Sequence, residues 1–206
     1  MEASSEEDED DEPLSQEERL ALSAFACAER GDAAELRRLA GRGVELGMVD
    51  EGGCSLAHEA AAGGQAGVVR LLGETTGDVL QRVRATLGAQ EAELGWTPFH
   101  AAASQGHAEC IEALAQITDD PATSIWLTRD REGGTPLHVA AMAGHVTAVR
   151  ALLATLPEGA GEGAWSAVAA RDHSDLTALH SAIIEGRAEV NFFQTRGSLC
   201  TNTPAH

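Results

Sequence analysis

A four-residue pattern recurs along the chain, always with histidine in its last place. Its four copies are Ser55–His58, Thr97–His100, Thr135–His138 and Thr177–His180. A glycine follows six residues after each histidine, at Gly64, Gly106, Gly144 and Gly186. A degenerate copy precedes them, with Phe25 in the histidine place. Recurrence in register predicts a repeat array, in which each unit buries its apolar face against its neighbours.

The spacing predicts two helices per unit. A Ser or Thr hydroxyl caps the first helix, proline is tolerated in its first turn, and the glycine accepts the left-handed conformation that ends it. Apolar residues 11 and 14 positions after the histidine, as in Val69 and Leu72, lie on one face of a second helix. Asp and Gly upstream, as in Asp50 and Gly53, indicate a turn. We therefore expect an all-α solenoid of helix-turn-helix repeats.

The units resemble ankyrin repeats over about residues 18–190, most fully in Gly134–His145 and Trp96–His107. The resemblance implies about five repeats, the first degenerate and the last incomplete. It also implies that the motif residues are structural, stabilising the turn and linking neighbouring repeats. These residues are Thr97, His100, Thr135, His138, Thr177 and His180, with Gly64, Gly106, Gly144 and Gly186.

The expected organisation has three parts. Residues 1–18 hold ten acidic and no basic residues, which predicts a disordered tail. Repeats are expected near 19–49, 50–91, 92–129, 130–171 and 172–190, which together form a domain over 19–190. Residues 191–206 break the pattern, because Asn191 and Gln194 stand where apolar residues are expected. This segment is interpreted as derived from a splice or frame change, or else as a divergent terminal cap.

The connections between repeats are longer than usual for the family. The histidines lie 42, 38 and 42 residues apart, against a family period of about 33. The first connection predicts a short extra helix, capped by Asp78 and ended by Gly88, with Val79, Leu80, Val83 and Leu87 on one face. Trp126 and Trp165 lie in the other long connections, where each is either an interface anchor or a plug against the core.

The resemblance also predicts which residues face a binding groove. In the family these are the first, fourth and fifth positions after the histidine. In this chain they are Glu59, Ala62, Gly63, Ala101, Ser104, Gln105, Val139, Met142 and Ala143. Their small and partly apolar character favours a partner helix or extended peptide.

The net charge of the chain further restricts the class of partner that we expect. The net charge is -19, and all 14 basic residues are arginine. Without lysine, neither a P-loop nor a Schiff-base mechanism is possible. A strongly acidic chain also disfavours direct nucleic-acid binding, whereas a basic protein partner would be attracted.

No catalytic, metal or cofactor site is expected from the motifs. Most histidines fall at repeat positions, and the four cysteines do not have metal-ligand spacing. We interpret the cysteines as reduced thiols of a cytoplasmic or nuclear protein. No apolar run of transmembrane length occurs, so membrane insertion is not expected.

The function that these features predict is a noncatalytic protein-interaction scaffold or adaptor. Two alternatives stay open. The array could be a targeting module of a larger catalytic or channel protein, or the acidic tail could bind basic nuclear proteins.

Overall fold

The computed structural model describes residues 14–118, 127–156 and 166–187. Within these ranges the fold is all-α, with two isolated β-bridges as its only extended pairing. The predicted all-α repeat architecture is therefore confirmed. Trp126, Trp165, residues 1–13 of the predicted tail and the segment 191–206 lie outside the described residues. The last three residues of that predicted tail, 16–18, are helical, because Ser15 caps a helix that begins at Gln16.

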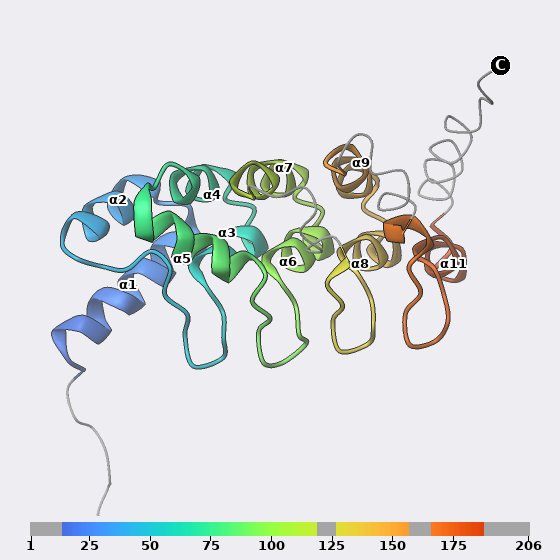
Figure 1. The fold of residues 1–206 in the computed structure, drawn as a ribbon, viewed down its shortest axis with the longest axis horizontal. Helices are drawn as coiled ribbons and strands as arrows, with labels where there is room; N and C mark the ends of the chain where they lie inside the picture. Colours follow the sequence, from blue (N-terminus) through green and yellow to red (C-terminus); the bar gives the residue numbers. More distant parts are fainter. Residues whose placement is uncertain (1–13, 119–126, 157–165, 188–206) are drawn as a thin grey trace, which may run out of the picture.

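The helices form two parallel layers (Figure 1). The first helices of the repeats make one layer: α1 (Gln16–Arg30), α3 (Leu56–Ala62), α6 (Pro98–Gln105), α8 (Pro136–Ala143) and α11 (Ala178–Ile184). The second helices make the other: α2 (Ala33–Gly41), α4 (Ala66–Gly73), α7 (Ala108–Ile117) and α9 (Val146–Ala154). Each helix packs against the next in its own layer and against its partner in the same repeat. We call the first layer the inner layer and the second the outer layer.

Local signals explain where the inner helices begin and end. In α6 the Thr97 side chain accepts from the backbone N–H of His100, and the His100 side chain accepts from the backbone N–H of Thr97. This reciprocal cap satisfies two donors that a helix start leaves free. Gly106 ends α6 with φ 80°, and a Cβ there would lie 2.8 Å from the His145 ring. Glycine is thus required both by the left-handed backbone and by the close approach of the next repeat.

Small residues allow the layers to approach closely. Ala60, Ala61, Ala102 and Ala103 are all fully buried, together with Phe99. The same pair of positions is filled by the buried alanines Ala140 and Ala141 in α8. Close packing of this kind leaves no room for larger side chains at these positions.

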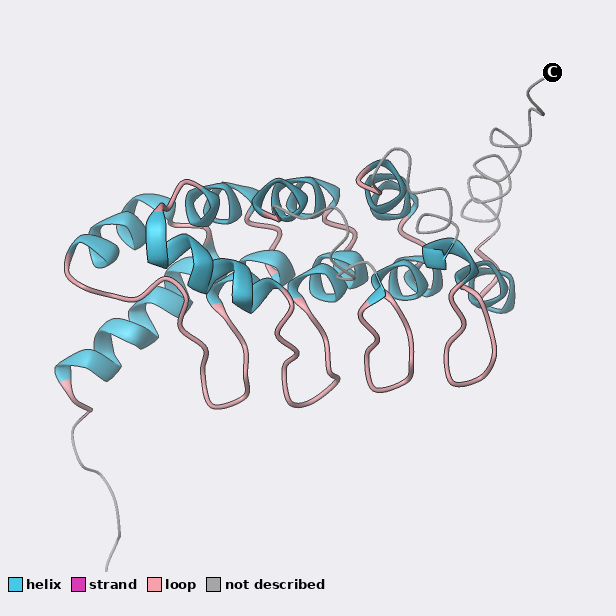
Figure 2. Ribbon diagram, viewed as in Figure 1, coloured by secondary structure: helices cyan, strands magenta, loops and turns pink. Residues whose placement is uncertain are grey.

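Four long loops extend from the inner layer and lie side by side, drawn in pink in Figure 2. We call them fingers 2 to 5, numbered by the repeat that each precedes, with turns at 50–53, 91–95, 130–133 and 172–175. At finger 2 the Asp50 carboxylate accepts from the backbone N–H of Cys54 at 2.7 Å. Asp130 does the same for Gly134 at 2.7 Å. The turns predicted at these two fingers are present, closed by the expected aspartates.

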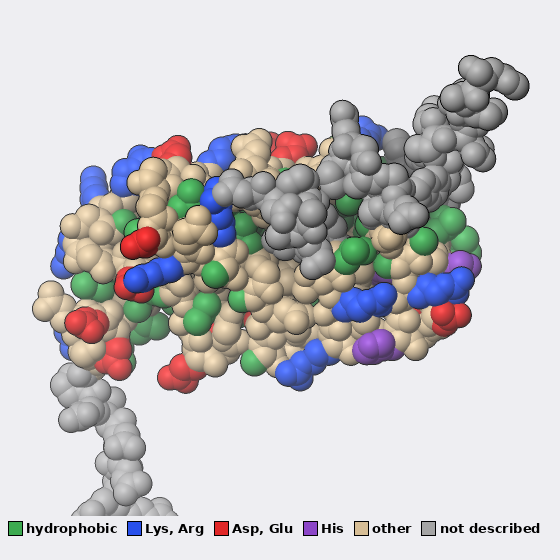
Figure 3. All heavy atoms as spheres, viewed as in Figure 1, with side chains coloured by type: hydrophobic (Ala, Val, Ile, Leu, Met, Phe, Trp, Pro, Cys, Tyr) green, Lys and Arg blue, Asp and Glu red, His purple; other side chains and the backbone are tan. Residues whose placement is uncertain are grey.

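The expected extra helix is present as α5 (Gly77–Leu87), but two details of the prediction were wrong. The cap residue is Thr76, because the helix begins one residue before Asp78. Val83 and Leu87 are fully buried and Leu80 packs against the core, whereas Val79 remains 42% exposed. The apolar face is therefore narrower than its sequence pattern indicates. On the face drawn in Figure 3, side chains of both charges lie among hydrophobic ones.

Candidate protein-binding groove

Backbone hydrogen bonds tie each finger to the next. The N–H of Ala92 donates to the carbonyl of Gly52 at 2.7 Å, and that of Arg131 to Leu94 at 3.0 Å. The N–H of His173 donates to Glu132 at 3.0 Å. The three acceptor carbonyls occupy equivalent positions, six residues before the motif histidine, and the bonds hold neighbouring fingers together beside the inner helices.

The motif histidines make a second set of links between repeats. His100 Nδ1 accepts from the Thr97 N–H, so its Nε2 is the protonated nitrogen and donates to the Gly134 carbonyl at 3.3 Å. His58 reaches Trp96 and His138 reaches Leu176 in the same way, each at 3.1 Å. Burial lowers the pKa of His58, His100 and His138, with that of His100 lowered to about 4. These histidines are neutral, buried and fully used, which leaves none of them as a ligand or base.

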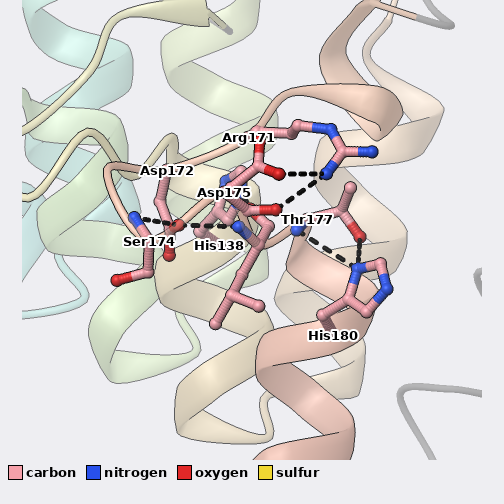
Figure 4. A network of polar contacts seen from close by, with 8 residues as sticks. His138, Arg171, Asp172, Ser174, Asp175, Thr177 and His180 are labelled. Carbon is pink, nitrogen blue, oxygen red and sulfur yellow. Dashed lines mark hydrogen bonds and ion pairs between the residues drawn. The ribbon is translucent and has the colours of Figure 1, made fainter.

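Finger 5 repeats this design without the expected glycine (Figure 4). Asp175 takes a positive φ of 62°, and its side chain and carbonyl both accept from Arg171. Thr177 and His180 form the same capping pair as in the other repeats. At finger 3 the Asp position is absent, and the Glu91 carboxylate accepts from the N–H groups of Leu94 and Trp96 instead. Sequence reasoning missed both substitutes, because neither follows the family pattern.

A hollow of about 480 Å³ lies between fingers 3 to 5 and the helices α8 and α11. We call it the concave groove. Its floor is apolar: Leu94 is 47% exposed and Met142 40% exposed, and Trp96 and Val139 are half-buried beside them. Exposed apolar side chains that gather in one hollow are typical of a binding surface.

The rim of the concave groove is acidic. Among the described residues that line it, one cation, Arg131, faces five carboxylates: Glu93, Asp130, Glu132, Asp172 and Glu185. Asp130 and Asp172 also close their finger turns, so their positions are fixed by backbone N–H donors. A cationic side chain entering the groove would meet several fixed negative charges at once.

The acidic character continues along the array to repeat 2. Burial raises the pKa of the Glu59 carboxyl, and the neighbouring charges of Glu29 and Asp50 raise it further. At the base of finger 2, burial raises the pKa of the Cys54 thiol to about 11, with added effects from nearby carboxylates. Burial is the larger cause of both shifts, and the smaller, electrostatic part comes from carboxylates near the fingers.

The structure separates the predicted groove residues into two sets. Val139, Met142 and Ala143 line the concave groove together. Ala62 and Gln105 are exposed and Glu59 and Ser104 half-buried, but none of these four lines the same hollow. Ala101 exposes only 7% of its surface and offers a partner little to contact. Leu94 and Trp96, which sequence reasoning did not select, come from the finger positions that vary between repeats.

Within the described residues, no group of three or more His, Cys, Asp or Glu side chains is placed to hold a metal ion. In the same part of the chain, no helix is long and apolar enough to cross a membrane.

Paired helices joined by fingers, with a hollow along the fingers, define a repeat protein of the solenoid class. The sequence matches the family of ankyrin repeats (3 copies) over residues 24–125, 76–164 and 122–193. The chain belongs to the ankyrin repeat family, and proteins of this family generally bind other proteins and are typically noncatalytic. Comparison with curated proteins found no match.

Proposed function

We propose that this protein is a noncatalytic interaction module that binds a segment of another protein in the concave groove. The observation that carries the proposal is the apolar floor at Leu94 and Met142, enclosed by an acidic rim. A bound segment would place an apolar side chain over this floor and direct Lys or Arg to the carboxylates. The same charge opposes the phosphates of a nucleic acid.

The proposal includes a cytoplasmic or nuclear location. Its support is that Cys27, Cys54 and Cys110 are free thiols, the state expected in a reducing compartment.

Selection from a random peptide library tests the groove, because the protein itself chooses the sequences that it binds. Immobilised full-length protein is expected to enrich peptides that combine apolar residues with Lys or Arg. The double variant Leu94→Ser/Met142→Ser should weaken the selected peptides by about tenfold or more, because two exposed apolar contacts are removed. Fluorescence anisotropy measures the affinity.

The matched control is Val79→Ser, which changes a similarly exposed apolar residue on α5, outside the groove. Its peptide affinity should equal that of the unchanged protein. An equal loss of peptide affinity in both variants, or no loss of affinity in Leu94→Ser/Met142→Ser, would contradict the proposal. Circular dichroism on the same samples establishes that each variant is folded.

A further inference from the structure

A second hollow lies at the other end of the array, beside α1. This helix has 15 residues, against 8 in α6 and α8, and its first turns extend past the end of the repeat stack (Figure 1). A hollow of about 980 Å³ lies between these turns and the connection 42–52 that leads into finger 2. We call it the N-terminal pocket. It shares no lining residue with the concave groove.

The N-terminal pocket is apolar inside. Leu20, Phe25, Val44 and Met48 are half-buried and pack against the core, which gives the pocket a fixed floor. At its edge three large apolar side chains remain exposed: Leu14 at 49%, Leu22 at 56% and Val49 at 49%. They come from both sides of the pocket, so a guest between α1 and the connection would cover all three.

The contribution of α1 has helical periodicity. Leu14, Glu18, Ala21 and Phe25 line the pocket at intervals of four, three and four residues, which places them on one face of the chain as it enters and follows the helix. Such a row is the kind of ridge that a second helix packs against. A helical guest therefore fits this wall better than a single extended strand, whose side chains alternate with a period of two.

Charge determines what such a helix would carry. Glu17, Glu18, Asp50 and Glu51 line the pocket, and Arg42 is the one basic residue on it within the described chain. The chain that precedes Leu14 adds eight acidic residues and no basic one over positions 1–13. This segment is repelled by the pocket and is a poor occupant, whereas a helix with Lys and Arg is attracted by both. Figure 3 shows acidic and hydrophobic side chains next to each other over α1.

We propose that the N-terminal pocket is a second docking site, which binds a basic amphipathic helix of a partner protein. The apolar face of that helix lies between α1 and the connection 42–52, and its Lys and Arg residues flank the acidic edge. The site is separate from the concave groove, so the protein can hold two partner segments at once.

A defined probe tests this site: a labelled peptide of about 18 residues of Leu and Lys, arranged with helical periodicity. A control peptide of identical composition but scrambled order has the same charge without the helical arrangement of Leu and Lys. Comparing the two peptides shows whether an amphipathic helix is required. The full chain should bind the helical peptide, and the double variant Leu22→Ser/Val49→Ser should weaken binding by about tenfold. Replacing Glu17 and Glu51 by Gln should weaken peptide binding by less than Leu22→Ser/Val49→Ser does. It should also reduce the dependence of the peptide affinity on salt concentration.

Two controls locate the binding. Val79→Ser alters an exposed apolar residue outside both hollows and should leave affinity unchanged. Leu94→Ser/Met142→Ser removes binding at the concave groove, and in that background Leu22→Ser/Val49→Ser should still weaken binding of the helical peptide. If only the groove variant loses the peptide, the N-terminal site is disproved while the proposed function stands. Equal binding of the scrambled peptide, or an unaffected Leu22→Ser single variant, would also overturn the proposal.

Discussion

At the scale of one residue, Cys54 illustrates how the surroundings of finger 2 change the pKa of an ionisable side chain. Its thiol lies at the base of finger 2, where burial raises its pKa to about 11 and the carboxylates of Asp50, Glu59, Glu91 and Glu93 add to the effect. Each carboxylate disfavours a further negative charge nearby. The carboxylates therefore add to the effect of burial, which remains the larger cause of the raised pKa.

We expect Cys54 to be alkylated slowly by iodoacetamide at pH 8. A pKa raised from 9.0 to about 11 cuts the thiolate fraction roughly a hundredfold, and the greater nucleophilicity of the more basic thiolate restores about tenfold of this. The net rate should be about tenfold below that of an unperturbed thiol. Mass spectrometry of the Cys54 peptide measures it.

The pH dependence of the alkylation rate distinguishes a raised thiol pKa from simple steric shielding of Cys54. The rate should still rise tenfold per pH unit beyond pH 9, and Glu59→Gln should shift the profile to lower pH because one carboxylate is removed. A profile that levels off near pH 9 would show that neither burial nor the carboxylates raise the pKa of this thiol.

At the scale of elements, α5 ties neighbouring repeats together. Val83 and Leu87 are buried in the core, and Arg84 Nε donates to the carbonyl of Ile117 at the end of α7 at 2.9 Å. Arg82 forms an ion pair with Glu45 in the connection that follows α2. The insertion thus contacts repeats 1 and 3, so it is an integral part of the array.

Leu87→Ala should lower the free energy of unfolding by about 2–5 kcal/mol, since it removes a fully buried side chain and leaves a cavity. Val79→Ala, on the same helix, should change it by no more than about 0.5 kcal/mol because Val79 is already exposed. Urea unfolding followed by circular dichroism gives both values. Similar losses in the two variants would mean that α5 does not pack as described.

For the whole molecule, the chain of histidine links makes stability depend on pH. Folding lowers the pKa of His58, His100 and His138 through burial, so the unfolded chain binds more protons below about pH 6.5. Their stabilising contribution is present above that pH and is lost as the pH falls toward 4. This loss destabilises the whole array, because each histidine joins one repeat to the next.

The free energy of unfolding should therefore fall steadily between pH 6.5 and pH 4. His100→Gln keeps a Thr-x-x-Gln capping pair but removes the titration, and should reduce the fall by an amount on the order of 3 kcal/mol at pH 4. His173→Gln, at an exposed finger residue, is the control and should leave the slope unchanged. Urea titrations across this pH range measure the effect; an unaltered slope in His100→Gln would contradict it.

The repeat architecture was predictable from sequence because its determinants are local. Thr97 and His100 cap their own helix, Gly106 ends it, and Ala102 and Ala103 are small for any neighbour of the same kind. Because the same residues recur in each repeat, a repeat whose helices can be predicted from its sequence also indicates where the helices of the next repeat lie. The start of α5 was misplaced by two residues, and the exposure of Val79 was not foreseen, because both depend on what packs against the helix.

The sequence by itself determined the fold class, since helix caps and periodicity act over a few residues. The tertiary structure decided which side chains from different fingers and connections line the same hollow as the predicted groove residues. Leu94 and Met142 line one hollow where backbone bonds hold finger 3 against finger 4, and Leu22 and Val49 line another between α1 and the connection 42–52. Such arrangements depend on how distant segments pack, which no local pattern encodes.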